Sequence, residues 1–284
     1  MTRSLTASAM SCEARERPTA PVGGGGARPV KWTARVLTML LAALRVASLA
    51  PRAWLRLAGR LFVRGPELDV PWEAGSTRAP RGHRWFAATY DLVTRWGEAR
   101  VLSRYRPVVA GQAVGRVLEI GAGTGANFPY YGRVDQLVAV EPDPYMLRRA
   151  RRRAERLGLA VDLRQAAAEA LPFADASFDT VVATLVFCTV GDPARALAEV
   201  RRVLKPGGTF RFIEHVRADA PALAWLQDRL TPVWQRLGAG CHPNRQTLEA
   251  IEGAGFEIVE LQRQPFGPTP LIVGVARATQ GVGV

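Results

Sequence analysis

The chain has 284 residues and contains few cysteines and almost no lysine, and each scarcity removes a class of function. Its three cysteines, Cys12, Cys188 and Cys241, lie far apart and form no C-x-x-C pair. This spacing fits neither a disulfide scaffold nor a zinc site, so we expect no metal and a reducing, cytoplasmic compartment. The only lysines are Lys31 and Lys205, which excludes the Tyr-x-x-x-Lys pair of one class of nicotinamide enzymes.

Long apolar runs are also missing. The most apolar stretch, residues 36–50, is interrupted by Arg45 and is shorter than the about 20 apolar residues that a transmembrane helix needs. Arginine then recurs at every fourth position, at Arg52, Arg56, Arg60 and Arg64. The spacing predicts a basic amphipathic helix, because apolar residues such as Trp54 and Leu61 fall on another face. Residues 31–64 therefore contain either a membrane-surface anchor or helices packed on the domain that follows.

The net charge is +13, and residues 1–80 carry more than half of it, with 12 of the 38 basic and 5 of the 25 acidic residues. Nearly all basic residues are arginine, which partly reflects codon bias. The positive charge is therefore poor evidence for nucleic acid binding, and we expect no such partner. Residues 1–30 are low in complexity, with four consecutive glycines, three prolines and scattered arginines, and we predict them to be a disordered leader. Residues 65–82 are predicted to be a linker, residues 83–277 a folded domain and residues 278–284 a tail.

A glycine-rich loop follows a short apolar strand at residues 117–120. Gly121, Gly123 and Gly125 allow positive φ and close approach of a ligand, in a turn predicted to run into a helix with free N–H groups. Gly121-x-Gly123-x-x-Ala126 fits the dinucleotide fingerprint. Glu119-x-Gly121-x-Gly123-x-Gly125 resembles the first motif of class I S-adenosylmethionine-dependent methyltransferases. The loop alone leaves both cofactors open.

Strands and helices alternate after this loop. The second predicted strand, residues 137–140, ends in Glu141, where a carboxylate can accept hydrogen bonds from both ribose hydroxyls. Further apolar strands are predicted over 160–164, 177–184, 209–213, 256–261 and 271–276, with helices over 83–109, 145–157 and 225–237 between or before them. The pattern predicts a Rossmann-like α/β fold, a seven-stranded mostly parallel sheet with helices on both faces, behind an N-terminal extension that is disordered and amphipathic-helical.

The later motifs narrow the family. Residues 204–208, Leu-Lys-Pro-Gly-Gly, resemble a turn of class I methyltransferases, and the resemblance covers roughly residues 84–277. Residues 123–128, 184–190 and 214–216 resemble the methyltransferase-like 7 (thiol methyltransferase) branch, whose core bacterial quinone and phospholipid methyltransferases share. The resemblance implies S-adenosylmethionine as cofactor, a membrane anchor near residues 36–64, and a small lipophilic acceptor, with a thiol favoured. Quinone or phospholipid methylation and a non-catalytic cofactor-binding or membrane-surface protein remain alternatives, and the oligomeric state is not predicted.

The resemblance also assigns a cofactor site. Its residues come from the glycine loop, the ends of the next strands and the loop after the third strand: Glu119, Gly121, Gly123, Gly125, Asn127, Glu141, Pro142, Met146, Ala168, Glu169, Thr184 and Leu185. Ala167 stands where such sequences commonly carry an aspartate for the adenine amino group. We therefore expect backbone groups, packing and Glu169 to hold the adenine.

The acceptor is predicted to meet the end of the fourth strand, residues 184–188, which is apolar. Enzymes that methylate amino groups of nucleic acids usually carry an Asn/Asp-Pro-Pro-aromatic motif there, and this chain has Thr-Leu-Val-Phe-Cys instead. Glu214 and His215 end the fifth strand and are the catalytic candidates, because a thiol must lose its proton and histidine titrates near neutral pH. His215 as a purely structural histidine stays open. The predicted pocket residues are Tyr90, Cys188, Asp228, Cys241, His242 and Asn244.

Overall fold

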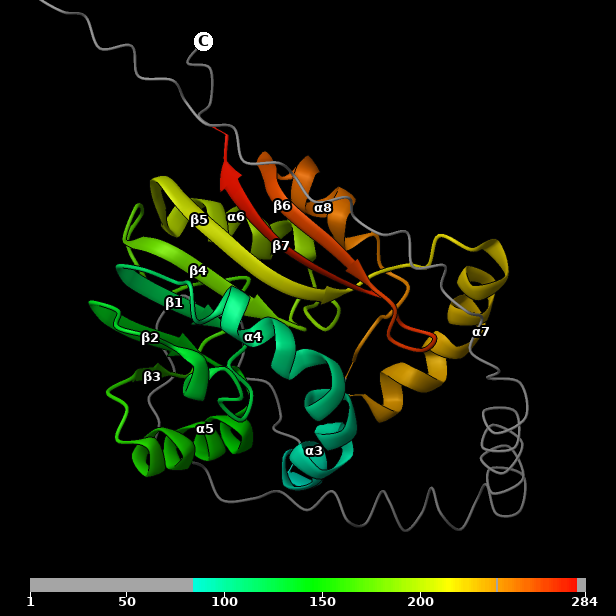
Figure 1. Cartoon of the computed structure of the whole chain (residues 1–284), viewed down its shortest axis with the longest axis horizontal. Helices are drawn as coiled ribbons and strands as arrows, with labels where there is room; N and C mark the ends of the chain where they lie inside the picture. The colour runs from blue at the N-terminus through cyan, green and yellow to red at the C-terminus, as the bar shows by residue number, and fades with distance from the viewer. Residues whose placement is uncertain (1–83, 239, 280–284) are drawn as a thin grey trace, which may run out of the picture. The chain divides into compact units, whose positions relative to one another are not determined.

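The computed structural model describes residues 84–238 and 240–279, which form a seven-stranded sheet with helices around it (Figure 1). The strand order is β3-β2-β1-β4-β5-β7-β6. The strands are β1 (Arg116–Ile120), β2 (Gln136–Val140), β3 (Asp162–Arg164), β4 (Phe178–Thr184), β5 (Leu204–His215), β6 (Phe256–Gln264) and β7 (Leu271–Ala278). Strands β1 to β5 are parallel, and β7 runs antiparallel to both β5 and β6. The predicted sheet is confirmed.

The helices connect and cover these strands. They are α3 (Arg84–Gly97), the π-helical turn Glu98–Leu102, α4 (Ser103–Val109), the 3₁₀ turn Phe128–Tyr130, α5 (Pro144–Leu157), α6 (Pro193–Val203), α7 (Pro221–Leu237) and α8 (Thr247–Gly253). Asp143 and Asp192 cap α5 and α6 by accepting backbone N–H groups of the first turn, with a proline next to each cap. Aspartate is favoured as the cap of a helix and proline in its first turn, so both helix starts follow from their local sequence.

The core lies on both faces of the sheet. Leu118 and Ile120 pack with residues of α6 and α8, whereas Val117 packs with residues of α4 and α5. Because successive strand side chains point to opposite faces, a strand covered on both sides must be apolar throughout. This explains why β1, β2, β4 and β7 are largely apolar runs, whereas β6 at the edge of the sheet is mostly exposed and carries polar residues.

The helix predicted after the glycine loop is wrong, and the chain forms only the 3₁₀ turn Phe128–Tyr130 there. The N–H groups of Gly125 and Phe128 each donate to the carbonyl three residues earlier. Pro129 has no N–H and disfavours helical backbone at Phe128, and Tyr131 is already extended. Strand β5 also begins earlier than predicted, at Leu204.

The expectations for residues 1–82 lie outside the described residues. Within residues 84–238 and 240–279, none of the helices combines the length and the apolar character needed to cross a membrane.

We expect Phe210→Ala to lower the free energy of unfolding by about 3–5 kcal/mol. Phe210 is fully buried in β5 and its ring contacts those of Phe187, Phe212 and Phe256. Urea unfolding followed by circular dichroism measures the change. The control is Val259→Ala on β6, where the side chain is 46% exposed and the expected change is within about 0.5 kcal/mol. Equal losses in the two variants would contradict this account of the core.

Candidate cofactor and acceptor site

The glycine loop follows β1 at the carboxyl edge of the sheet, and its three glycines do different things. All three have positive φ, between 56° and 77°. A Cβ on Gly121 would lie 2.7 Å from Val186, and one on Gly125 would lie 2.6 Å from the Phe128 ring, so both are needed for packing. A Cβ on Gly123 would meet nothing nearer than 4.0 Å. The loop is therefore closely packed at Gly121 and Gly125 and open at Gly123, where the backbone can approach a ligand.

Glu141 ends β2 and bridges this loop. Its Oε2 accepts the Gly123 N–H at 2.8 Å and its Oε1 accepts the Asp143 N–H at 2.9 Å. Burial raises the pKa of Glu141 to about 7, against the lowering effect of these two bonds. A carboxylate has about four lone-pair positions, so each oxygen can still accept a ribose hydroxyl. The arrangement fits the ribose of S-adenosylmethionine.

A buried polar network supports the loop from below. Glu119 accepts hydrogen bonds from Asn127 Nδ2 at 3.0 Å and from the Tyr131 hydroxyl at 2.9 Å, and burial raises its pKa to about 7. Asn127 also donates to Thr184 on β4. Arg106 of α4 donates to Asn127 Oδ1 at 2.5 Å. These bonds explain why Glu119 and Asn127 are buried, and their contact with the cofactor stays a prediction.

Sequence reasoning missed the two residues that complete this network. Arg106 forms a two-pronged ion pair with Glu98, at 2.6 and 2.7 Å. Both residues lie in the predicted helical segment 83–109, where charged residues between the apolar positions are expected at the surface. Side chains that pair along an α-helix are three or four residues apart, and Glu98 and Arg106 are eight apart, so their spacing gives no signal of an ion pair. The π-helical turn Glu98–Leu102 lies in this segment.

Helix α3 joins the glycine loop through Asp91. Thr124 donates to Asp91 at 2.7 Å, and Arg153 of α5 pairs with the same carboxylate at 3.1 Å. The neighbouring Tyr90 is half-buried, and burial raises the pKa of its hydroxyl to about 12. The Arg106 guanidinium acts against this rise. The role of Tyr90 in the acceptor pocket stays a prediction.

Glu214 holds the loop that follows β4. It is fully buried, and it accepts the N–H groups of Val186, Phe187 and Cys188 at 2.7, 3.1 and 3.3 Å. Burial raises its pKa to about 8, against these three bonds. The preceding Leu185 has φ of 58°, which is uncommon for a residue with a side chain. These contacts support a positioning role for Glu214, and its predicted catalytic role is untested.

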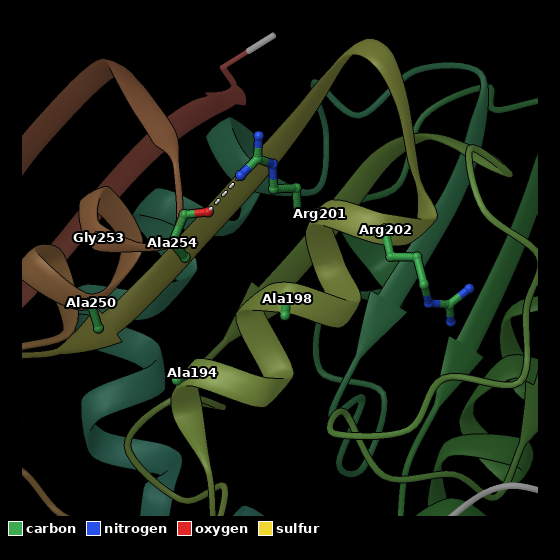
Figure 2. A pocket seen from close by; sticks show the side chains of 7 residues that line it. All are labelled: Ala194, Ala198, Arg201, Arg202, Ala250, Gly253 and Ala254. Carbon is green, nitrogen blue, oxygen red and sulfur yellow. Dashed lines mark hydrogen bonds between the residues drawn. The ribbon is translucent and has the colours of Figure 1, made fainter. Parts of the chain in front are cut away.

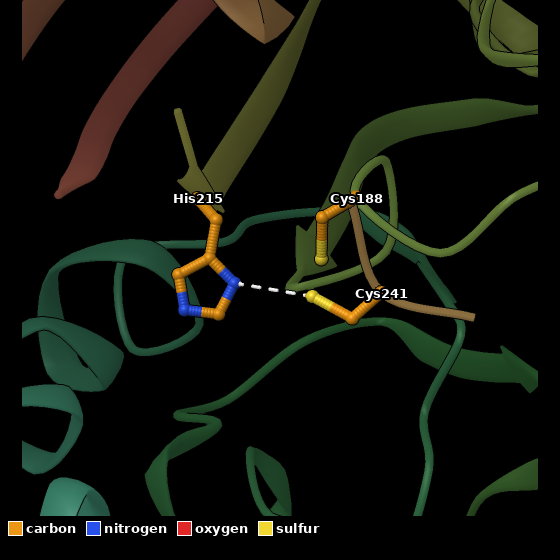
Figure 3. A group of neighbouring side chains, drawn as sticks. All are labelled: Cys188, His215 and Cys241. Atoms are coloured by element: carbon orange, nitrogen blue, oxygen red, sulfur yellow. Dashed lines mark hydrogen bonds between the residues drawn. The ribbon is translucent and has the colours of Figure 1, made fainter. Parts of the chain in front are cut away.

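Cys188, His215 and Cys241 converge from three separate segments, and we call them the Cys–His cluster (Figure 3). Cys241 Sγ lies 3.7 Å from His215 Nδ1, and all three side chains are buried. The Cys188 thiol and, more weakly, His215 lower the pKa of Cys241 to about 5, and the same contact together with burial raises the pKa of Cys188. The next residue, His242, donates its N–H to the Cys188 carbonyl at 2.6 Å.

Asp228 and Asn244 lie at the surface side of this region. Asp228 accepts two hydrogen bonds from Arg217, at 2.6 and 2.8 Å, and one from Asn244 Nδ2 at 2.9 Å. These partners lower the pKa of Asp228 to about 2. The three side chains tie α7 to the loop after it, and the predicted pocket role of Asp228 and Asn244 is untested.

The remaining predicted cofactor residues lie around the same edge of the sheet. Met146 and Ala168 are buried, and the carbonyl of Pro142 accepts the Gln165 amide. Glu169 accepts the Gly191 N–H at 2.8 Å, so it links the loop after β3 to the start of α6. Its role toward adenine stays a prediction.

A shallow groove of about 800 Å³ lies elsewhere, between α6 and α8 (Figure 2). It is lined by Ala194, Ala198, Arg201, Arg202, Ala250, Gly253 and Ala254. Arg201 donates to the Ala254 carbonyl and Arg202 pairs with Glu199 and Asp175. None of the predicted site residues lines this groove, and its two arginines already have partners.

The amino-acid sequence is similar to those of known methyltransferases. A family described as "Methyltransferase domain" matches residues 118–212, from β1 into β5. Phosphatidylethanolamine N-methyltransferase of Cereibacter sphaeroides is 37% identical over 188 residues, covering 65% of this chain and 89% of the relative. The chain belongs to the class I S-adenosylmethionine-dependent methyltransferases, as the motifs predicted, and S-adenosylmethionine is its cofactor.

Another relative supports the class, and a solved structure shares the fold. Thiol S-methyltransferase TMT1B of Rattus norvegicus is 40% identical over 160 residues, covering 52% of this chain and 63% of the relative. The match therefore spans less than two thirds of that relative's length. Among solved structures, the [4+2]-cyclase SpnF superposes with a TM-score of 0.53 at 22% identity, over 73% of this chain and 99% of that one. A likeness at that identity concerns the fold alone.

We expect Glu141→Gln to weaken binding of S-adenosylhomocysteine by about 10- to 100-fold, because hydrogen bonds to a charged group contribute about 1.5–3 kcal/mol. Isothermal titration calorimetry measures the affinity. The control is Glu257→Gln on the exposed face of β6, which should bind as the wild type does. Unchanged affinity in Glu141→Gln would remove Glu141 from the cofactor site.

The raised pKa of Glu141 also predicts a pH dependence. Only the ionised carboxylate accepts from both ribose hydroxyls, and it becomes protonated as the pH falls through its pKa of about 7. Affinity for S-adenosylhomocysteine should therefore fall about tenfold between about pH 8 and about pH 6. Glu141→Gln should flatten this dependence, and a slope that persists in that variant would assign it to another group.

Proposed function

We propose that this methyltransferase S-methylates a small lipophilic thiol. The observation that carries the proposal is the acceptor end of β4 and β5, where the apolar loop 185–188 meets His215. His215 Nε2 is buried and has no hydrogen-bond partner among the described residues, so it is free to act on an acceptor. The similarity to thiol S-methyltransferases supports the same acceptor class.

For this reaction the protein must align the two reactants, exclude water from the site and promote loss of the thiol proton. S-adenosylmethionine supplies a methyl group on a sulfonium sulfur. The acceptor thiol loses its proton, its sulfur forms the new bond to the methyl carbon, and the electron pair of the broken bond stays on the cofactor sulfur. Thiolate is the nucleophile, so His215 and its neighbours would promote loss of the thiol proton. Burial of the apolar loop would exclude water and align the reactants.

Phospholipid N-methylation is the second candidate, and exposed apolar side chains favour it. Helices α3 and α7 both lie at the end of the sheet toward which β1, β4 and β5 point (Figure 1). Their exposed large apolar residues are Leu92, Val93, Trp96, Trp225, Val233 and Trp234. Such residues suit a lipid surface. The relative from Cereibacter sphaeroides is a phospholipid methyltransferase by name and matches over most of its length.

The test compares acceptors directly. Full-length protein in detergent is assayed for S-adenosylhomocysteine release with small alkyl and aryl thiols, with phosphatidylethanolamine and with a quinone extract. We expect turnover of the thiols, at a rate that rises with pH as thiolate forms. The alcohols of matching shape are the control and should not react.

Two results would contradict the thiol proposal. Turnover of phosphatidylethanolamine or quinones alone would establish one of the alternative acceptors. Binding of S-adenosylmethionine without turnover of any acceptor would favour a non-catalytic cofactor-binding protein.

A further inference from the structure

The Cys–His cluster has the composition of a metal site. The ligand atoms of Cys188, His215 and Cys241 all lie within 4.8 Å of one another, and both cysteines are reduced and buried. Side chains from the loop after β4, the end of β5 and the loop after α7 point toward one another (Figure 3). We propose that Cys188, Cys241 and His215 bind a zinc ion. The distances along the sequence argued against a metal, because they do not reveal that Cys188 meets Cys241.

The distances suit one shared ion. With zinc–sulfur and zinc–nitrogen bonds of about 2.3 and 2.0 Å in tetrahedral geometry, two ligand atoms stand about 3.6 Å apart. Cys241 Sγ and His215 Nδ1 lie 3.7 Å apart. The widest separation in the cluster, 4.8 Å at most, would close by about 1 Å. Side-chain rotation alone can supply such a change.

The chemistry of the donors selects the ion. Two thiolates and one imidazole are soft and borderline donors, which prefer zinc over magnesium or calcium. Two thiolates also balance the charge of a divalent ion, which a buried site requires.

The surroundings hold the three ligands in place. Glu214 fixes the Cys188 loop through three N–H groups, and the His242 N–H ties the Cys241 loop to the Cys188 carbonyl. The His215 ring stacks on Phe266 with 6.1 Å between ring centres. These contacts fix the two loops and the ring, while the second ring nitrogen of His215, Nε2, has no hydrogen-bond partner among the described residues. A disulfide between Cys188 and Cys241 would need none of the contacts of His215.

The role of the ion rests on the proposed function. Three protein ligands leave a fourth position open, as in catalytic zinc sites. An acceptor thiol bound at that position would release its proton to solvent. Its sulfur would then form the bond to the methyl carbon, and the electron pair of the broken carbon–sulfur bond would stay on the cofactor. Zinc would thus lower the thiol pKa, and His215 would act as a ligand of the ion.

Metal content tests the site independently of catalysis. Full-length protein, purified with a reductant and without chelator, is titrated with Zn²⁺ and with Co²⁺. We expect one ion per chain and, with Co²⁺, a sulfur-to-metal charge-transfer band. Cys188→Ser, Cys241→Ser and His215→Asn should each weaken binding by more than about 100-fold, since loss of a supporting group alone costs 10- to 100-fold. Cys12→Ser is the matched control and should bind as the wild type does.

Binding of S-adenosylhomocysteine to each variant shows that it folds. The proposal is overturned if the reduced wild type binds no zinc, if the three variants bind it unchanged, or if thiol turnover survives complete removal of zinc. A Cys188–Cys241 disulfide in protein purified without reductant, with no zinc bound after reduction, would overturn it in favour of a redox pair. Zinc binding without thiol turnover would support the site and contradict the proposed acceptor.

Discussion

Three buried glutamates at the carboxyl ends of strands hold the loops of the site in place. Glu119 on β1 binds Asn127, Glu141 after β2 binds the glycine loop, and Glu214 on β5 binds the loop after β4. Burial raises the pKa of all three to about 7 or 8. Because the folded-state pKa lies above the unfolded value, ionisation costs folding free energy as the pH rises from about 4.5 to about 8. The hydrogen bonds that the three carboxylates accept, from backbone N–H groups at Glu141 and Glu214 and from side chains at Glu119, offset part of this cost.

The same edge of the sheet divides into two halves that touch. The predicted cofactor half rests on β1 and β2, and the predicted acceptor half rests on β4 and β5. They meet where Val186 packs against Gly121, so close that any side chain at position 121 would push the acceptor loop away. The loop's own backbone is held by Glu214, and Arg245 donates to the carbonyls of Phe187 and Val190. The two loops are therefore packed against each other, so a substitution in the glycine loop would also shift the loop 185–188.

The sequence predicted what depends on local pattern and missed what depends on tertiary contact. The strands could be predicted because a sheet covered on both faces needs apolar runs, and Glu141 because it directly follows one. The prediction of a helix after the glycine loop was wrong. It followed the general dinucleotide fingerprint and gave no weight to Pro129, which disfavours helical backbone at Phe128. The ion pair of Glu98 and Arg106 could not be predicted from the sequence. Arg106 also donates to Asn127, and this contact exists only once the chain has folded. Cys188 and Cys241, 53 positions apart, meet only through the topology of the sheet.

A crystal structure of the full chain with S-adenosylhomocysteine tests the central claim most directly. The account predicts that the ligand lies over Gly123, with both ribose hydroxyls within hydrogen-bond distance of Glu141 and its sulfur facing the loop 185–188. A ligand bound elsewhere, for example in the groove between α6 and α8, would contradict it. So would a ligand over Gly123 whose ribose is held by another carboxylate.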